Sequence, residues 1–166
     1  MNGDSPDSVV IRLATPRDRQ VIERLRASVG WSMLETGLSS MQQGRSIIYI
    51  LEVNDMPAAS GALVLNGEDE DLAEGRSRAL ISNLIVDPRF QSRGFGTELL
   101  GFLEEQARQR HFNTVTIGVD ASNVRARKLY ERHGYRDLKT KEEPWGLVYY
   151  LAKPLAKSGQ PTSGQR

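Results

Sequence analysis

The chain has 166 residues, of which 39% are hydrophobic and 26% are charged, and this predicts one globular domain with a sizeable core. Its 22 basic and 21 acidic residues nearly cancel, which gives no support for nucleic acid or a membrane as partner. There is no cysteine and there are only two histidines, so disulfides and thiol catalysis are excluded and no metal site is expected. No apolar run reaches the roughly 20 residues of a membrane span, and the polar start lacks a signal peptide's apolar region, so we expect a cytoplasmic protein.

The predicted elements alternate in a mixed α/β pattern. Thr15-Pro16 supplies a helix N-cap followed by proline, and Gly30 and Gly134 are typical helix ends. In chain order we predict a strand at 9–13, a helix ending at Gly30, a shorter helical piece within 31–44, strands at 46–53, 57–65 and 79–86, a helix at 94–110, a strand at 114–119, a helix at 123–133 and a strand at 147–151. This order predicts one domain over 9–155 with an antiparallel first half, and residues 1–8 and 157–166 are expected to be flexible termini.

An acidic loop is predicted between the strands at 57–65 and 79–86. It carries five carboxylates, at Glu68, Asp69, Glu70, Asp71 and Glu74. Such a run attracts a cationic amine or is simply a solvated face, and we favour the solvated face.

A glycine turn, Gln91-Ser92-Arg93-Gly94-Phe95-Gly96-Thr97, follows the strand at 79–86 and opens the helix at 94–110. Glycine lets the backbone turn tightly and approach a ligand closely. The N–H groups at a helix start lie at the positive end of its dipole, so a phosphate or pyrophosphate is the natural occupant. Arg89 and Arg93 would add positive charge. Taken alone, such a turn is more often a plain helix start.

Two known phosphate-binding motifs fit the turn poorly. A P-loop has Lys and then Ser or Thr after its second glycine, but Gly96 is followed by a Thr-Glu pair. A dinucleotide fingerprint would use Asp120 for the ribose, but its third glycine is Leu99 here, and seven residues separate Val86 from Gly94. A nucleotide-dependent oxidoreductase would rest only on these two glycines and Asp120.

Two segments together resemble the signatures of the GNAT superfamily of N-acetyltransferases. Gln91–Gly96 is similar to its Q/R-x-x-G-x-G/A motif, and Leu84–Pro88 is similar to the strand that leads into it. Asn123–Tyr135 resembles the second signature, in which Asn, Ala, Tyr, Gly and an aromatic recur at these spacings. The order of the predicted elements agrees over 9–154. The resemblance implies a GNAT-like fold, with a central mixed, mostly antiparallel sheet flanked by helices.

The resemblance implies acetyl-CoA as the acyl donor and no metal. In the family, backbone amides of the glycine turn hold the pyrophosphate, which carries over to Ser92, Arg93, Gly94, Phe95, Gly96 and Thr97, with Gln91 bracing the turn. The lead-in strand pairs its main chain with the pantetheine arm, which carries over to Leu84, Ile85 and Val86. Asn123 resembles the residue that approaches the cofactor from the next strand-to-helix junction.

Tyr130 matches the position of the family's usual general acid. Attack of an amine on a thioester expels a thiolate, which a nearby hydroxyl can protonate or hydrogen-bond. The other interpretation of Tyr130 is a core aromatic, and both hold if the ring is buried and the hydroxyl reaches the sulfur.

The general base is left open by the sequence. The family often has a glutamate on the lead-in strand, where this chain has Ser82-Asn83. The candidates are a water held by either residue, a carboxylate such as Asp120 or Glu35, or no dedicated base. A backbone N–H near Leu84 or Ile85 would meet the oxyanion.

The resemblance implies transfer of an acetyl group to a primary amine of a small molecule or peptide, by direct attack in a ternary complex. In the family the acceptor enters near the first helices and the last strands, here 31–41 and 142–145. Trp31 and Trp145 either line this pocket or cap the core. The alternative function is a catalytically idle acyl-CoA-binding module, which the missing strand carboxylate favours and Tyr130 opposes. Many relatives form homodimers, and this sequence leaves the oligomeric state open.

Overall fold

The computed structural model describes residues 5–31 and 38–156. In chain order the elements are β1 (Val9–Leu13), η1 (Pro16–Asp18), α1 (Arg19–Ser28), α2 (Leu38–Gln42), β2 (Ser46–Val53), β3 (Met56–Val64), β4 (Arg78–Val86), η2 (Pro88–Phe90), α3 (Phe95–Gln109), β5 (Thr114–Asp120), α4 (Val124–Arg132), β6 (Arg136–Glu143) and β7 (Gly146–Pro154). The strands are hydrogen-bonded neighbours in the order β1-β2-β3-β4-β5-β7-β6. None of the helices in the described ranges is long and apolar enough to cross a membrane.

The chain divides into two compact units. Unit 1 comprises the described residues up to Ala62 together with Asn83–Leu103, and unit 2 comprises Leu63–Ser82 and the described residues from Glu104 onward. Both β3 and β4 therefore begin in one unit and end in the other.

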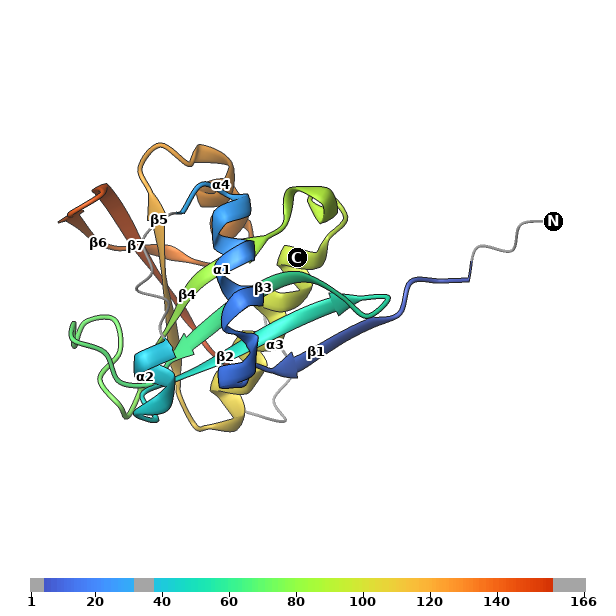
Figure 1. Cartoon of the computed structure of the whole chain (residues 1–166). Coiled ribbons are helices and arrows are strands. Elements are labelled where there is room, and N and C mark those ends of the chain that lie inside the picture. Colours follow the sequence, from blue (N-terminus) through green and yellow to red (C-terminus); the bar gives the residue numbers. More distant parts are fainter. Residues whose placement is uncertain (1–4, 32–37, 157–166) are drawn as a thin grey trace. The chain divides into compact units, whose positions relative to one another are not determined.

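In unit 1, β2 packs against helices on both of its faces. Ile48 of β2 forms an apolar cluster with Ile22 of α1 and Leu38 of α2. The neighbouring Tyr49 ring instead lies 5.0 Å from the Phe102 ring of α3. Because successive strand residues point to opposite faces, α1 and α3 cover opposite sides of β2, as Figure 1 shows.

Local sequence signals explain how the elements of unit 1 begin and end. The predicted N-cap is confirmed, because the Thr15 hydroxyl accepts from the Arg17 N–H and the Asp18 carboxylate completes a capping box. Asn54 and Asp55, between β2 and β3, have φ of 50° and 66°, as a tight hairpin turn requires. The predicted helical piece within 31–44 is observed as α2, while residues 32–37 lie outside the described residues.

In unit 2, β4 and β5 run parallel, with Arg78–Ile81 opposite Thr114–Ile117. β7 pairs antiparallel with both β5 and β6, so β6 is an edge strand. Leu72, from the predicted acidic loop, packs against Val148 and Tyr150 of β7. The mixed α/β class and the mostly antiparallel sheet predicted from the sequence are confirmed.

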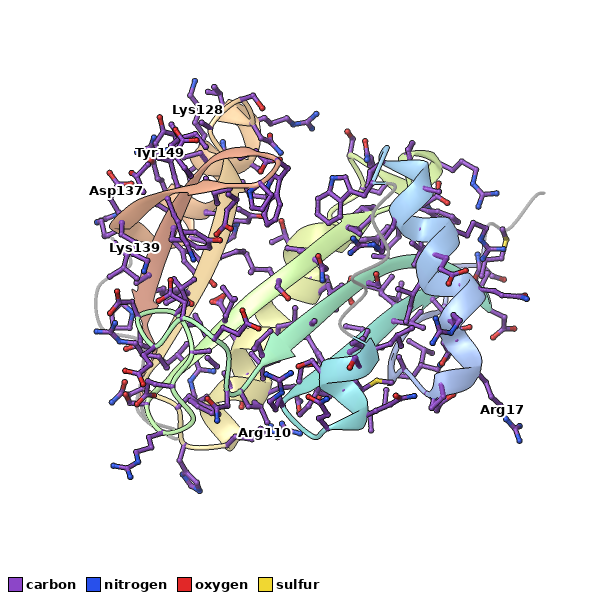
Figure 2. All side chains as sticks on the ribbon, turned by 60° about the vertical axis from the view of Figure 1, so that its left-hand side comes forward. Arg17, Arg110, Lys128, Asp137, Lys139 and Tyr149 are labelled. Atoms are coloured by element: carbon purple, nitrogen blue, oxygen red, sulfur yellow. The ribbon has the colours of Figure 1, made fainter. Side chains whose placement is uncertain are left out.

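The prediction missed β6 and was wrong in placing a single strand after α4. The sequence of β6, RDLKTKEE, has one apolar residue, Leu138, so it shows neither alternation nor an apolar run. It is a strand because its main chain pairs with β7 and its charged side chains find partners. Asp137, labelled in Figure 2, accepts hydrogen bonds of 2.9 and 3.1 Å from Arg127 of α4.

The acidic loop is fastened to β6 by ion pairs. Lys139 Nζ lies 2.6 Å from Asp69 Oδ2, and Lys141 Nζ lies 3.6 Å from the same oxygen. The hydrogen bond from Lys139 holds the pKa of Asp69 below its usual value. Glu68 and Glu70 are exposed. The expected solvated face therefore describes Glu68 and Glu70 but not Asp69, which anchors the loop.

Candidate functional site

One group of the predicted site residues lies in unit 1, where a turn joins β4 to α3. The first hydrogen bond of α3 runs from the Glu98 N–H to the Gly94 carbonyl at 3.0 Å. The N–H groups of Phe95, Gly96 and Thr97 therefore precede the helical ladder, at the positive end of the helix dipole. This arrangement is suited to an anion such as a phosphate.

The shape of the turn is fixed by left-handed residues and by one side chain. Ser92 and Gly94 have φ of 63° and 84°, and a Cβ added at Gly94 would meet nothing within 4 Å. Gln91 Nε2 donates to the Val86 carbonyl at 2.9 Å, which ties the turn to the end of β4. A Cβ added at Gly96 would lie only 3.3 Å from Val86 Cγ2, so the start of α3 packs closely on that strand.

Arg89 and Arg93, which were expected to add positive charge, each have a carboxylate partner. Arg89 Nη2 lies 3.0 Å from Asp87 Oδ2, and this hydrogen bond holds the pKa of the buried Asp87 below its usual value. Arg93 Nη2 lies 2.5 Å from Asp7 Oδ2, and its guanidinium is 5.1 Å from the centre of the Phe95 ring. The positive charge of Arg93 therefore stands beside the helix start, shared with a carboxylate of the N-terminal segment.

The predicted pantetheine strand begins directly after an unusual residue. Asn83 has a φ of 53° inside β4, and its Oδ1 accepts a 3.1 Å hydrogen bond from Arg26 Nη1 of α1. Arg26, Asn83 and Ser60 are polar lining residues of a cavity of about 10 Å³, which has room for about one water. Sequence reasoning missed Arg26. Its position one turn after Ile22, on the buried stripe of α1, is the signal that could have found it.

The predicted catalytic residue, Tyr130, lies in unit 2. Only 8% of it is exposed, and burial raises its pKa to about 12. Its ring centre lies 5.9 Å from that of Tyr135, which is fully buried, and whose hydroxyl has no hydrogen-bond partner among the described residues. The buried ring agrees with the core-aromatic interpretation and leaves the role of the hydroxyl open.

The remaining candidates of unit 2 surround the start of α4 and the β6–β7 hairpin. Asn123 caps α4, with Oδ1 accepting from the Ala126 N–H at 3.1 Å. Trp145 is 68% exposed and donates through Nε1 to Asp120 Oδ1 at 3.3 Å. The interpretation of Trp145 as a core cap is therefore wrong. Tyr150, on β7, donates to Glu143 Oε1 at 2.8 Å.

Two candidates belong to the N-terminal part of the chain. Trp31 is 39% exposed, and its ring lies 5.4 Å from the Arg26 guanidinium. Glu35, a candidate base, lies outside the described residues. The structure thus places the turn residues, Leu84–Val86 and Trp31 in unit 1, and Tyr130, Asn123, Asp120 and Trp145 in unit 2.

Comparison with known proteins decides the family. Residues 19–135, more than half of the chain, match the acetyltransferase (GNAT) family. The chain belongs to the GNAT family of acetyltransferases. The resemblance inferred from the glycine turn and from the segment around Tyr130 is therefore confirmed at the level of the family.

Individual GNAT proteins show how far the similarity extends. A ribosomal protein bS18-alanine N-acetyltransferase from Haemophilus ducreyi is 38% identical over 60 residues, which are 36% of this chain and 41% of that protein. The crystal structure of the ribosomal-protein-S18-alanine N-acetyltransferase from Escherichia coli covers 95% of this chain and 100% of its own, with a TM-score of 0.75 at 22% identity. A GNAT family acetyltransferase from Elizabethkingia anophelis with acetyl-CoA bound has a TM-score of 0.68 over 89% of this chain and 98% of its own, at 17% identity. The structural similarities establish a GNAT fold, and the aligned sequence spans less than half of the Haemophilus relative.

Proposed function

We propose that this GNAT protein transfers an acetyl group from acetyl-CoA to a primary amine by direct attack in a ternary complex. The observation that carries the proposal is the turn at the start of α3, where three backbone N–H groups precede the helical ladder and Arg93 adds a guanidinium. A pyrophosphate matches both features. The Elizabethkingia relative with acetyl-CoA bound supports the choice of donor.

We assign the cofactor contacts mainly to the backbone. The amides of Ser92–Thr97 hold the pyrophosphate, with Gln91 fixing the turn through Val86. The main chain of Leu84–Val86 pairs with the pantetheine arm. Asn123 contributes from the β5–α4 junction, where its side chain is engaged as the N-cap of α4.

Tyr130 is assigned as a hydrogen-bond donor to the departing sulfur. With its pKa raised to about 12 and that of a thiol near 8.5, full proton transfer to the thiolate would be uphill by roughly 5 kcal/mol. A hydrogen bond to a charged group is worth about 1.5–3 kcal/mol. Replacing Tyr130 by Phe should therefore lower kcat about 10- to 100-fold.

We assign the acceptor to amines that are partly neutral at neutral pH, with the α-amine of a peptide as the leading class. The stretch of β4 where relatives often carry a glutamate holds Ser82 and Asn83, without a carboxylate. At pH 7.5 about a third of an α-amine with a pKa near 7.8 is neutral, against roughly 0.1% of a lysine amine with a pKa near 10.4. The Haemophilus relative is named for acetylation of an alanine of a ribosomal protein, which agrees with this class.

Release of free thiol from acetyl-CoA tests the proposal. The panel should contain a peptide with a free N-terminal alanine and blocked lysines, the same peptide with a blocked N-terminus and free lysines, and small amines. Amine-dependent release that falls in Tyr130→Phe is expected, while Tyr149→Phe serves as control because that ring stacks on Arg127, 4.4 Å away. Equal release with and without amine would overturn the transferase assignment.

A catalytically idle acyl-CoA-binding module is the second candidate. The observation that favours it is that an arginine, Arg26, rather than a carboxylate, contacts Asn83 of β4. A rise in melting temperature with CoA, combined with no thiol release for any amine, would select this module.

A further inference from the structure

Asn83 has a left-handed backbone in the middle of β4, directly before the residues assigned to the pantetheine arm. Its φ of 53° is left-handed, whereas a strand is otherwise extended. The parallel register of β4 with β5 runs from Arg78 to Ile81, and the boundary between the two units falls between Ser82 and Asn83. We call this left-handed residue inside β4 the bulge, because a break in the extended backbone bends the chain and re-aims the residues that follow.

The residues after the bulge depend on this bend for their direction. Ile85 is 3% exposed and lines the same small cavity as Asn83. Leu84 Cδ1 lies 3.2 Å from where a Cβ would stand at Gly61 of β3. A change of Asn83 to the extended conformation would turn these side chains toward other faces of the strand.

Arg26 contacts the bulge from α1 and is an unusual residue to find there. It is 7% exposed, and burial lowers its pKa, because a charged guanidinium loses water on entering the protein. Arg26 Nη1 donates to Asn83 Oδ1 at 3.1 Å, and the guanidinium lies 5.4 Å from the Trp31 ring. The helix that carries it is fixed one turn earlier, where Ile22 packs on Ile48.

We infer that Arg26 is a positioning residue that holds Asn83 in its left-handed conformation and so presents Leu84–Val86 to the acyl-CoA. An asparagine side chain can hydrogen-bond to its own backbone neighbourhood in several conformations. The hydrogen bond from Arg26 occupies the side-chain oxygen Oδ1 of Asn83 and selects one of these conformations. The inference rests on the proposed function, since it concerns the strand assigned to the pantetheine arm.

A rescue experiment tests this role. Arg26→Met keeps the length of the side chain and removes its charge and donors. We expect it to raise the KM for acetyl-CoA and the Kd for CoA about tenfold, with a smaller change in kcat. Glycine adopts positive φ without a partner, so the Kd of Asn83→Gly for CoA should stay within about threefold of the wild-type value. The Kd of the double variant Arg26→Met/Asn83→Gly for CoA should match that of Asn83→Gly.

The double variant decides the question. If it binds CoA as poorly as Arg26→Met, or if Arg26→Met binds CoA normally, the positioning role is overturned. Circular dichroism and melting curves of each variant, with Arg26→Lys alongside, separate loss of the fold from loss of the bulge. A wild-type protein that binds CoA but transfers nothing would refute only the proposed transferase, because the CoA Kd still reports the rescue.

Discussion

Removing the buried hydroxyl of Tyr135 should stabilise the protein, whereas most mutations in a core lower its stability. Tyr135 is 0% exposed, and within the described ranges its hydroxyl lacks a hydrogen-bond partner. Burial raises its pKa, and the Glu104 carboxylate raises it further. A buried polar group without a partner costs about 1–3 kcal/mol of stability. Tyr135→Phe removes that group and keeps the ring, 5.6 Å from Lys153 Nζ.

Because the missing oxygen leaves a small void, we expect a net gain of about 1–2 kcal/mol. That gain corresponds to a rise in Tm of roughly 2–8 °C for a chain of this size. Urea unfolding at pH 7 and thermal melting should both report it.

Tyr150→Phe is the matched control, because the Tyr150 hydroxyl donates to Glu143 Oε1 at 2.8 Å. The same substitution there should destabilise by about 1.5–3 kcal/mol, as a hydrogen bond to a charged group is lost. A loss of stability of more than about 1 kcal/mol in Tyr135→Phe would refute the reasoning. It would mean that the Tyr135 hydroxyl makes a hydrogen bond in solution, with the Glu104 carboxylate as the first group to examine.

Three further perturbations test other parts of the molecule. A side chain at Gly94 meets open space but is strained by the φ of 84° there, and glutamate brings a negative charge to the turn. Gly94→Glu should therefore fold with a lowered Tm and lose the thermal shift caused by CoA; an unchanged shift would contradict the pyrophosphate assignment. Asp7→Asn removes the carboxylate that shares the positive charge of Arg93. The affinity for CoA, measured by calorimetry, should therefore rise about twofold to fivefold at low salt and less at high salt. No change in affinity at low salt would place Arg93 outside the site. Hydrogen bonds, the largest from the Arg78 N–H, hold the pKa of Glu74 at about 2 instead of 4.5. The stabilising effect of the Glu74 carboxylate is therefore full above pH 4.5 and is lost as the pH falls toward 2. Glu74→Gln should lower Tm at pH 7 but hardly at pH 2.5, and an equal loss of Tm at both pH values would argue against this role of the carboxylate.

Most of the fold could be predicted because local signals and tertiary structure agree. The strand predicted at 46–53 is β2 over the same residues, since an apolar, β-branched run is suited to a buried strand. The segment that includes Thr15 predicted the helix start, and Gly134, with φ of 96°, ends α4 as expected. The glycine turn was located correctly at the start of α3, because glycine is typical of a tight backbone turn and Gly94 has a φ of 84°.

The strand β6 and the contact of Arg26 could not be predicted, because both depend on residues far away along the chain. β6 is polar apart from Leu138, and its strand form relies on pairing with β7 and on ion pairs such as Lys139 with Asp69, 70 residues away. The position of Arg26 on the buried stripe of α1 could have predicted its burial, but its contact with Asn83, 57 positions later, could not be predicted. Such contacts leave no periodic signal in the sequence.

Backbone strain marks the proposed cofactor segment independently of the family resemblance. Among the described residues, those other than glycine with positive φ are Asn54, Asp55, Asn83, Ser92 and His111. The first two form the hairpin turn between β2 and β3, and His111 follows the end of α3, so each of these has a reason in the fold. Asn83 lies inside β4, and Ser92 lies in the exposed turn before α3. Because strained residues cluster where proteins bind and react, these two agree with the proposal that Leu84–Val86 and the turn at Ser92–Thr97 contact the cofactor.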